Sequence, residues 1–130
     1  MNLIFVEKET MNKKTLVIGA SLKPQRYSNI AIHKLVTYNH EVVAFGLREG
    51  EVAGVAIDKN LMPYKDIHTV TLYLNPERQK PFYDYIVSLH PERVIFNPGT
   101  ENSEFQNVLK QHQIIFEEAC TLVLLSTNQY

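Results

Sequence analysis

The stretch Leu16-Val17-Ile18-Gly19-Ala20-Ser21-Leu22-Lys23-Pro24 decides the fold of this 130-residue chain. Three apolar residues in a row are typical of a strand that is buried on both faces, as in a parallel sheet. Gly19 ends this strand, because glycine allows the backbone to turn tightly. Residues 29–38 then repeat apolar side chains at helical spacing, with Ser28 as the expected N-cap. The order of strand, glycine loop and helix predicts the first unit of an α/β domain.

The rest of the chain alternates short apolar runs with amphipathic segments. Strands are expected at residues 42–45, 52–57, 69–74, 94–96 and 114–116. A helix is expected to start at Asn75-Pro76, with Asn at the N-cap and Pro at the first helical position, and another covers 105–112. The tail, residues 119–125, fits a helix or a strand equally well. The alternation predicts the α/β class: a three-layer Rossmann-like domain with a mostly parallel sheet of five to six strands and helices on both faces.

Length and composition fit one globular domain, with 45% hydrophobic and 21% charged residues. We assign residues 1–14 to an N-terminal extension and residues 15–130 to the domain. The net charge of -1 gives no basic excess, so nucleic acid is not an expected partner. The apolar run at residues 3–6 is too short to span a membrane. A single cysteine cannot form an internal disulfide, which fits a cytoplasmic location.

Ligands of open α/β sheets bind beyond the carboxyl ends of the strands, where the strand order reverses. This rule points to four loops, at residues 19–28, 45–48, 74–76 and 97–102. The helix after the first loop offers unpaired amides and the positive end of its dipole to an anion. Ser21, Ser28, Lys23 and Arg26 can add hydrogen bonds to that anion. From this loop alone, anion binding and a plain turn with solvated charges both remain open.

The first loop is not a dinucleotide fingerprint. In the pattern G-x-G-x-x-G, Ser21 and Pro24 stand where the second and third glycines would be. An NAD site usually has an acidic residue after the second strand, but this chain has Phe45-Gly46-Leu47-Arg48. Arg48 instead suits a phosphorylated ribose, as in NADP or coenzyme A, or is simply an exposed loop arginine.

Two motifs carry a resemblance to a known family. The first is Val17-Ile18-Gly19-Ala20-Ser21-x-Lys23-Pro24, with Ser28 opening the helix, and the second is Asn97-Pro98-Gly99-x-Glu101-Asn102. From residue 15 to about residue 126, the chain resembles the small, stand-alone CoA-binding domain proteins. Their Rossmann-like fold is similar to the N-terminal domain of the succinyl-CoA synthetase alpha subunit. The chain departs from these relatives at Gly46-Leu47, where they often carry Asn-Pro.

The resemblance implies that coenzyme A or an acyl-CoA is the ligand. Its pyrophosphate would lie across residues 19–21 and the helix start, its adenosine at residues 45–48, and its pantetheine past Leu74, Asn75 and Gly99. The residues expected to bind this ligand are Gly19, Ala20, Ser21, Lys23, Pro24, Arg26, Tyr27, Ser28, Phe45, Gly46, Leu47, Arg48, Leu74, Asn75, Pro98 and Gly99.

The sequence offers no set of catalytic residues. Its five histidines have no metal-ligand spacing, and Cys120 is more typical of a small core residue than of a reactive thiol. We therefore expect a binding, carrier or regulatory module with a small-molecule nucleotide ligand, rather than an enzyme. Two alternatives stay open: an NADP-dependent oxidoreductase-type domain and a regulatory domain with a decayed nucleotide site. A second copy of the chain or a partner enzyme subunit also stays open as a protein partner.

Overall fold

The strands form one seven-stranded sheet, in the order β3-β4-β2-β1-β5-β6-β7, in a computed structural model that describes residues 12–130. Most of the predicted N-terminal extension, residues 1–11, lies outside the described residues. Every neighbouring pair is parallel except β3 and β4, which are antiparallel. The strands are β1 (Thr15–Ala20), β2 (Val42–Gly46), β3 (Gly50–Val52), β4 (Val55–Asp58), β5 (Thr69–Leu72), β6 (Arg93–Phe96) and β7 (Ile115–Glu118).

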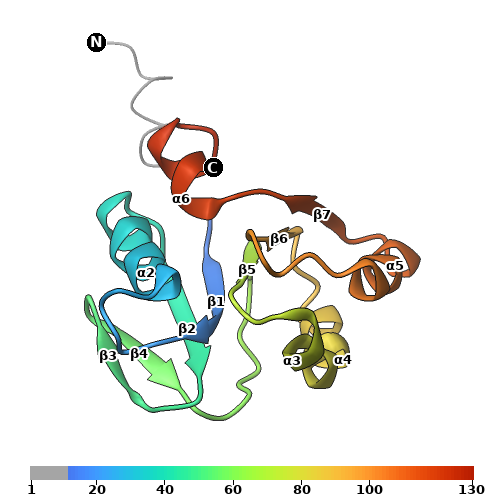
Figure 1. Cartoon of the computed structure of the whole chain (residues 1–130), viewed down its shortest axis with the longest axis horizontal. Helices are drawn as coiled ribbons and strands as arrows, with labels where there is room; N and C mark the ends of the chain where they lie inside the picture. Colours follow the sequence, from blue (N-terminus) through green and yellow to red (C-terminus); the bar gives the residue numbers. More distant parts are fainter. Residues whose placement is uncertain (1–11) are drawn as a thin grey trace.

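Helices cover both faces of the sheet, so the three-layer α/β prediction is confirmed (Figure 1). One face carries α2 (Tyr27–Thr37) and α6 (Thr121–Ser126), which also contact each other. The opposite face carries α3 (Pro76–Gln79), the 3-10 helix η1 (Lys80–Phe82), α4 (Tyr83–Ser88) and α5 (Ser103–Gln111).

The prediction of five to six strands was wrong because the segment 52–57 is not one strand. It contains the turn of a hairpin between β3 and β4, at Ala53-Gly54. Both turn residues have positive φ, 52° for Ala53 and 80° for Gly54, as the tightest β-hairpin turns require. The apolar spacing across this turn resembles one irregular strand, which hides the reversal.

Two helix predictions also need correction. Ser28 does not cap α2: the helix begins at Tyr27, and Arg26 occupies the N-cap without a side-chain hydrogen bond. The helix expected after Asn75 is divided into α3, η1 and α4. Pro81 lies in η1, and proline interrupts regular helical hydrogen bonding because it lacks an amide hydrogen. The ambiguous tail is helical, as α6.

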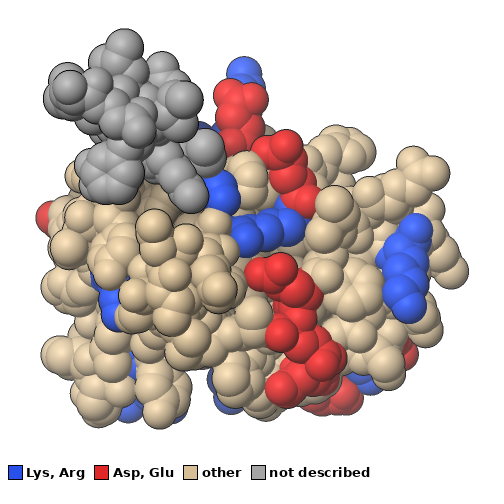
Figure 2. Space-filling model, turned by 90° about the horizontal axis from the view of Figure 1, so that it is seen from above, with Lys and Arg blue, Asp and Glu red and all other residues tan. Residues whose placement is uncertain are grey.

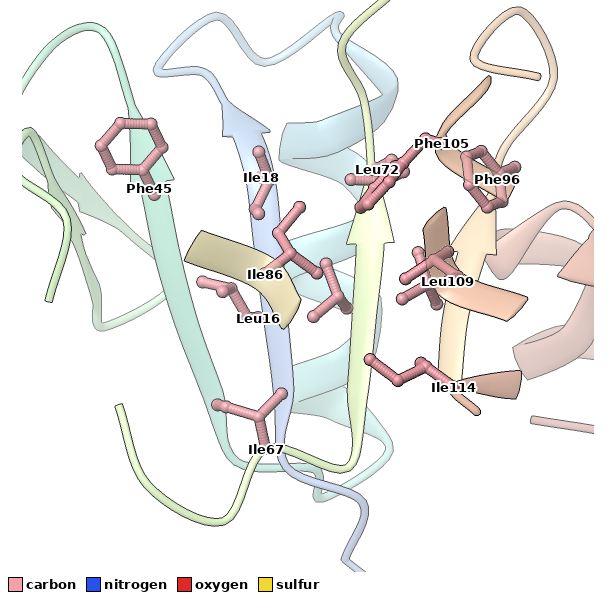
Figure 3. Close-up of a cluster of buried hydrophobic side chains, with 12 residues drawn as sticks. Leu16, Ile18, Phe45, Ile67, Leu72, Ile86, Phe96, Phe105, Leu109 and Ile114 are labelled. Atoms are coloured by element: carbon pink, nitrogen blue, oxygen red, sulfur yellow. The ribbon is translucent and has the colours of Figure 1, made fainter. Parts of the chain in front are cut away.

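β1 lies at the centre of the sheet and is buried on both faces. Leu16 and Ile18 pack with the larger apolar cluster on the α4 and α5 side, which also contains Phe96 and Phe105 (Figure 3). Val17 packs with the smaller cluster on the α2 and α6 side. β1 therefore contributes side chains to two separate cores, which fixes the strand between the two helix layers.

A backbone bend follows directly after Ile18. Gly19 has φ of +92°, and the pairing of β1 with β2 shifts register between Ile18 and Ala20. As a result Ala20 packs in the cluster opposite to that of Ile18. Its register partner is Gly46, where an added Cβ would lie 2.3 Å from the Ala20 carbonyl oxygen. The ends of β1 and β2 can approach this closely only because residue 46 has no side chain.

At the amino end of the sheet, Tyr130 packs between a histidine and an arginine. Its ring centroid lies 5.0 Å from that of His40 and 4.4 Å from the guanidinium carbon of Arg93. The His40 Nδ1 accepts a hydrogen bond from the Lys13 amide at 3.0 Å, which requires that this nitrogen carry no proton. Burial, reinforced by the charges of Lys13 and Arg93, lowers the pKa of His40.

The close approach at Gly46 yields a stability prediction. Gly46→Ala should lower the free energy of unfolding by about 2 to 3 kcal/mol, because the new methyl group meets backbone that cannot move aside. Gly54→Ala is the matched control: Gly54 has φ of +80° but nothing within 4 Å of an added Cβ, so only backbone strain of about 1 kcal/mol is expected. Urea unfolding of both variants measures the difference, and equal losses would contradict the close approach.

The half-buried His40 yields a pH prediction. The folded state binds a proton at His40 less readily than the unfolded chain, in which the histidine pKa is about 6.5. The contribution of His40 to stability is therefore present above this pH and is lost as the pH falls towards the lowered folded-state value. In the His40→Gln variant, the free energy of unfolding should fall less steeply as the pH is lowered from about 7.5 to about 5.5. The exposed His33→Gln is the control, and an unchanged slope in His40→Gln would refute this role.

Candidate functional site

The four predicted loops lie at the carboxyl edge of the sheet. The chain leaves β1 for β2 on one side and later returns to β5 on the other, so the strand order reverses between β1 and β5. Such a reversal separates the two neighbouring loops and opens space for a ligand. The carboxyl edge at β1 and β5 is therefore the candidate site.

The first loop is shaped by its own polar groups. The Ser21 Oγ accepts a hydrogen bond from the Lys23 amide at 3.1 Å. The Ser21 carbonyl oxygen accepts one from the side-chain amide of Asn29 at 2.8 Å. Asn29 is only 4% exposed, so it anchors the loop from the first turn of α2. Sequence reasoning missed this residue, because an asparagine inside the expected helix gives no signal that it points back to the loop.

The start of α2 is open to an anion. Its N-cap residue, Arg26, makes no side-chain bond to the helix amides, and the first turn contains no acidic residue. Lys23, Pro24 and Arg26 are exposed, and Tyr27 is 73% exposed. Ser28 is the exception at 4% exposed, so its side chain is part of the packed base of the loop. A helix end with free amides, adjacent cations and no carboxylate suits a phosphate group.

The second loop divides into a buried and an exposed half. The Phe45 side chain belongs to the core and meets the Phe82 ring edge-on, with centroids 5.3 Å apart. Gly46 is buried against Ala20, whereas Leu47 is 79% exposed and Arg48 is also exposed. The side chains that this loop presents to solvent are therefore those of Leu47 and Arg48.

A buried glutamine joins the third and fourth loops. The Gln79 side chain is 1% exposed, and its amide nitrogen donates to the carbonyl oxygens of Leu74 and Thr100, both at 2.8 Å. Its oxygen accepts from the Asn102 side chain at 2.9 Å. The Asn75 oxygen accepts from the Arg78 amide at 2.9 Å, so it caps α3 as expected. Gln79 was missed, because one glutamine in a polar helical turn resembles a solvent-facing residue.

Asn97, which directly follows β6, joins β5 to α6. Its side-chain nitrogen donates to the Thr71 hydroxyl at 2.7 Å and to the Leu72 carbonyl oxygen at 2.9 Å. Its oxygen accepts from the Thr121 amide at 2.9 Å. Beyond it, Pro98 and Gly99 are exposed. The Gly99 amide donates to Glu101 at 2.9 Å, so Glu101 shapes this loop.

Two further groups lie near the ends of β5 and β7. The Tyr73 hydroxyl is buried and makes no hydrogen bond within the described chain, and burial raises the pKa of Tyr73 to about 12. Cys120 is half-buried at the N-cap of α6. Among residues 12–130, no three His, Cys, Asp or Glu side chains are grouped to hold a metal ion.

A hollow of about 350 Å³ lies beside the second loop rather than at the first. We call it the β4 hollow, and its lining includes Glu49, Gly50, Asp58, Lys59, Asn60 and Met62. It does not include the glycine loop after β1, so the predicted residues share one edge without sharing one enclosed pocket. The hollow continues that edge outward, past β2 to β4.

Charges of both signs are mixed on the surface. Figure 2 shows basic and acidic side chains next to each other on the face seen there. Some of these opposite charges form ion pairs, such as Arg93–Glu117 at 3.6 Å and Lys14–Glu41 at 3.5 Å. No helix in the described part of the chain is long and apolar enough to cross a membrane.

The fold and the loops at its carboxyl edge define a Rossmann-like α/β domain. A family model described as a CoA binding domain matches residues 13–126, so the chain belongs to the CoA-binding domain family. This match confirms the family that the two loop motifs indicated. No functionally curated protein matches the chain.

Solved structures share the fold over nearly the whole chain. A crystal structure of an uncharacterized protein is 42% identical, with a TM-score of 0.90, and the match covers 92% of this chain and 99% of that chain. A protein from Thermus thermophilus is 19% identical with a TM-score of 0.79, covering 100% of both chains. A hypothetical protein from Pyrococcus horikoshii is 23% identical with a TM-score of 0.81, covering 98% of this chain and 91% of that chain.

The buried glutamine network can be tested directly. Gln79→Glu should lower the free energy of unfolding by about 3 kcal/mol, because a carboxylate cannot donate to the two carbonyl oxygens and is itself costly to bury. Gln111→Glu, at an exposed position of α5, makes the same chemical change and should cost less than about 0.5 kcal/mol. Chemical unfolding measures both. A similar small effect in the two variants would show that Gln79 does not hold the loops together.

Proposed function

We propose that this protein binds coenzyme A or an acyl-CoA through the loops at the carboxyl edge, as a non-catalytic binding, carrier or regulatory module. Membership of the CoA-binding domain family supports a CoA-type ligand in general. A bound CoA would supply a thiol that carries the acyl group. The contribution of this chain is to hold and orient the nucleotide end of that ligand.

One observation carries the proposal: the open, acid-free start of α2 next to Gly19. Donors for a pyrophosphate are the free amides of residues 27 and 28, the Ser21 hydroxyl and the exposed Lys23 and Arg26. The bend at Gly19 packs its backbone against the residue that follows β5: an added Cβ would lie 3.0 Å from the Tyr73 carbonyl. The Leu74 side chain lies 3.1 Å from the same position, so residue 19 has no room for a side chain and the first loop starts packed against the residues that follow β5.

The remaining loops supply the rest of the proposed path. The adenosine would reach the exposed pair Leu47 and Arg48, and the pantetheine would pass Leu74, Asn75 and Gly99. The Gln79 contacts to the carbonyl oxygens of Leu74 and Thr100 hold the two sides of this second stretch together. The ligand would thus follow the edge from β2 across β1 to β6.

The chemistry of the buried polar side chains supports a binding role. Asn29, Gln79, Asn97 and Asn102 all use their amide groups to hold backbone or neighbouring side chains. Amides of this kind are neither acids nor bases at neutral pH, and those of Gln79, Asn97 and Asn102 are engaged at both the nitrogen and the oxygen. They preorganise the loops, which favours affinity rather than turnover.

An NADP-type ligand is the second candidate. The observation that favours it is Arg48, which is exposed after β2, where a ribose phosphate would be recognised. In both candidates the ligand is a small nucleotide bound at the same edge. The compartment and any homo-oligomer or partner subunit stay predictions from the sequence.

Titration calorimetry with CoA, acetyl-CoA, NADP and NAD tests this proposal. We expect heat with the two CoA forms, and the double variant Lys23→Ala/Arg26→Ala should bind them about tenfold more weakly, because it removes two charge-assisted contacts to phosphate. Lys65→Ala removes an exposed charge from a different loop and should leave affinity unchanged.

The outcomes separate the candidates. Heat with NADP alone would favour the oxidoreductase-type alternative. No heat with any of the four, from a protein that unfolds cooperatively, would indicate a decayed site and overturn CoA binding.

A further inference from the structure

The β4 hollow contains a carboxylate close to the end of β2, although β2 itself has no acidic residue. Asp58 is the last residue of β4 and is the register partner of Phe45 on β2. In dinucleotide sites an acid at the end of the second strand accepts the ribose hydroxyls. Here the acid comes from the adjacent strand, one position further along the same edge.

The Asp58 carboxylate is held in place by a tyrosine. Its Oδ2 accepts a hydrogen bond from the Tyr64 hydroxyl. Burial and the neighbouring Asp58 raise the pKa of Tyr64, so this hydroxyl keeps its proton and remains the donor. No hydrogen bond to the Asp58 Oδ1 occurs among residues 12–130. The side chain is thus fixed at one oxygen and able to accept a further hydroxyl at the other.

The size and charge of the hollow restrict what it can hold. A volume of about 350 Å³ is at the lower end for small-molecule sites, so it suits a nucleoside rather than a whole CoA molecule. Its lining carries Glu49 and Asp58 against Lys59, which is two negative charges and one positive charge, or -1 in total. A neutral ribose diol is compatible with this charge, whereas a phosphate dianion beside Asp58 is repelled.

We propose that the β4 hollow receives the adenosine end of the ligand with its ribose hydroxyls free and bound by Asp58. The inference rests on the proposed CoA-type function and specifies its ligand further. The site then favours a CoA form that lacks the ribose 3′-phosphate, and Arg48, which is outside the lining of the hollow, is an exposed loop arginine with no ribose phosphate to bind. Tyr64 is a positioning residue, because it acts by holding the Asp58 carboxylate.

Calorimetry with CoA and 3′-dephospho-CoA tests this preference on the full chain. Wild-type protein should bind dephospho-CoA about tenfold more tightly than CoA, because the added phosphate meets the carboxylate. Asp58→Asn keeps an oxygen that can accept from Tyr64 but removes the charge. This variant should lose most of the preference by binding CoA more tightly and dephospho-CoA more weakly.

Glu51→Gln is the matched control. Glu51 is an exposed residue of β3 outside the lining of the hollow, and its replacement changes the net charge by the same amount. It should leave the preference intact. Equal or tighter binding of CoA by the wild-type protein, or an unchanged preference in Asp58→Asn, would overturn the role of Asp58 while leaving CoA binding established. No binding of either form would overturn the proposed function and this inference together.

Discussion

The rest of the structure depends on the backbone bend at Gly19. β1 supplies apolar side chains to both cores. It cannot move towards one helix layer without exposing the side chains that it packs into the core on the opposite face. The positive φ of Gly19 lets the strand end there and turns Ala20 to the opposite core. It also brings the loop against Tyr73, the residue that follows the neighbouring strand β5. A single conformational constraint thus fixes the central strand, its exit and the position of the first candidate loop.

Buried amide side chains then hold the remaining loops in relation to this bend. Asn29 fastens the first loop from α2, Gln79 joins the third loop to the fourth, and Asn97 joins β5 to α6. Each amide donates to a backbone carbonyl oxygen, and those of Gln79 and Asn97 also accept, which satisfies backbone groups that would otherwise be buried without partners. The carboxyl edge is consequently rigid on the β5 and β6 side. The second loop, in contrast, presents the side chains of Leu47 and Arg48 to solvent.

The sequence predicted the parts of the fold that depend on local patterns. The strand at residues 16–18, the Asn75-Pro76 helix start and the alternation of strands and helices follow from hydrophobic spacing and capping chemistry, and the structure confirms them. The β3–β4 hairpin was missed because Ala53 adopts a positive φ that its residue type does not announce. Gln79 was missed because its partner Thr100 is distant in the sequence, and Asn29 was missed because its partner Ser21 precedes it in the loop. Long-range hydrogen bonds leave no local pattern, whereas the four candidate loops followed from topology alone.

The β3–β4 hairpin has a consequence for how this domain can diversify. Its two strands meet the rest of the sheet through β2, where β4 pairs at Ala44 and Phe45. Its turn at Ala53-Gly54 is exposed and can change while the bend at Gly19 and the amide contacts of β5 and β6 stay as they are, whereas Val52 and Ile57 are held in the core on the α2 side. Mutations in this exposed turn should therefore be tolerated more readily than mutations in the central strands.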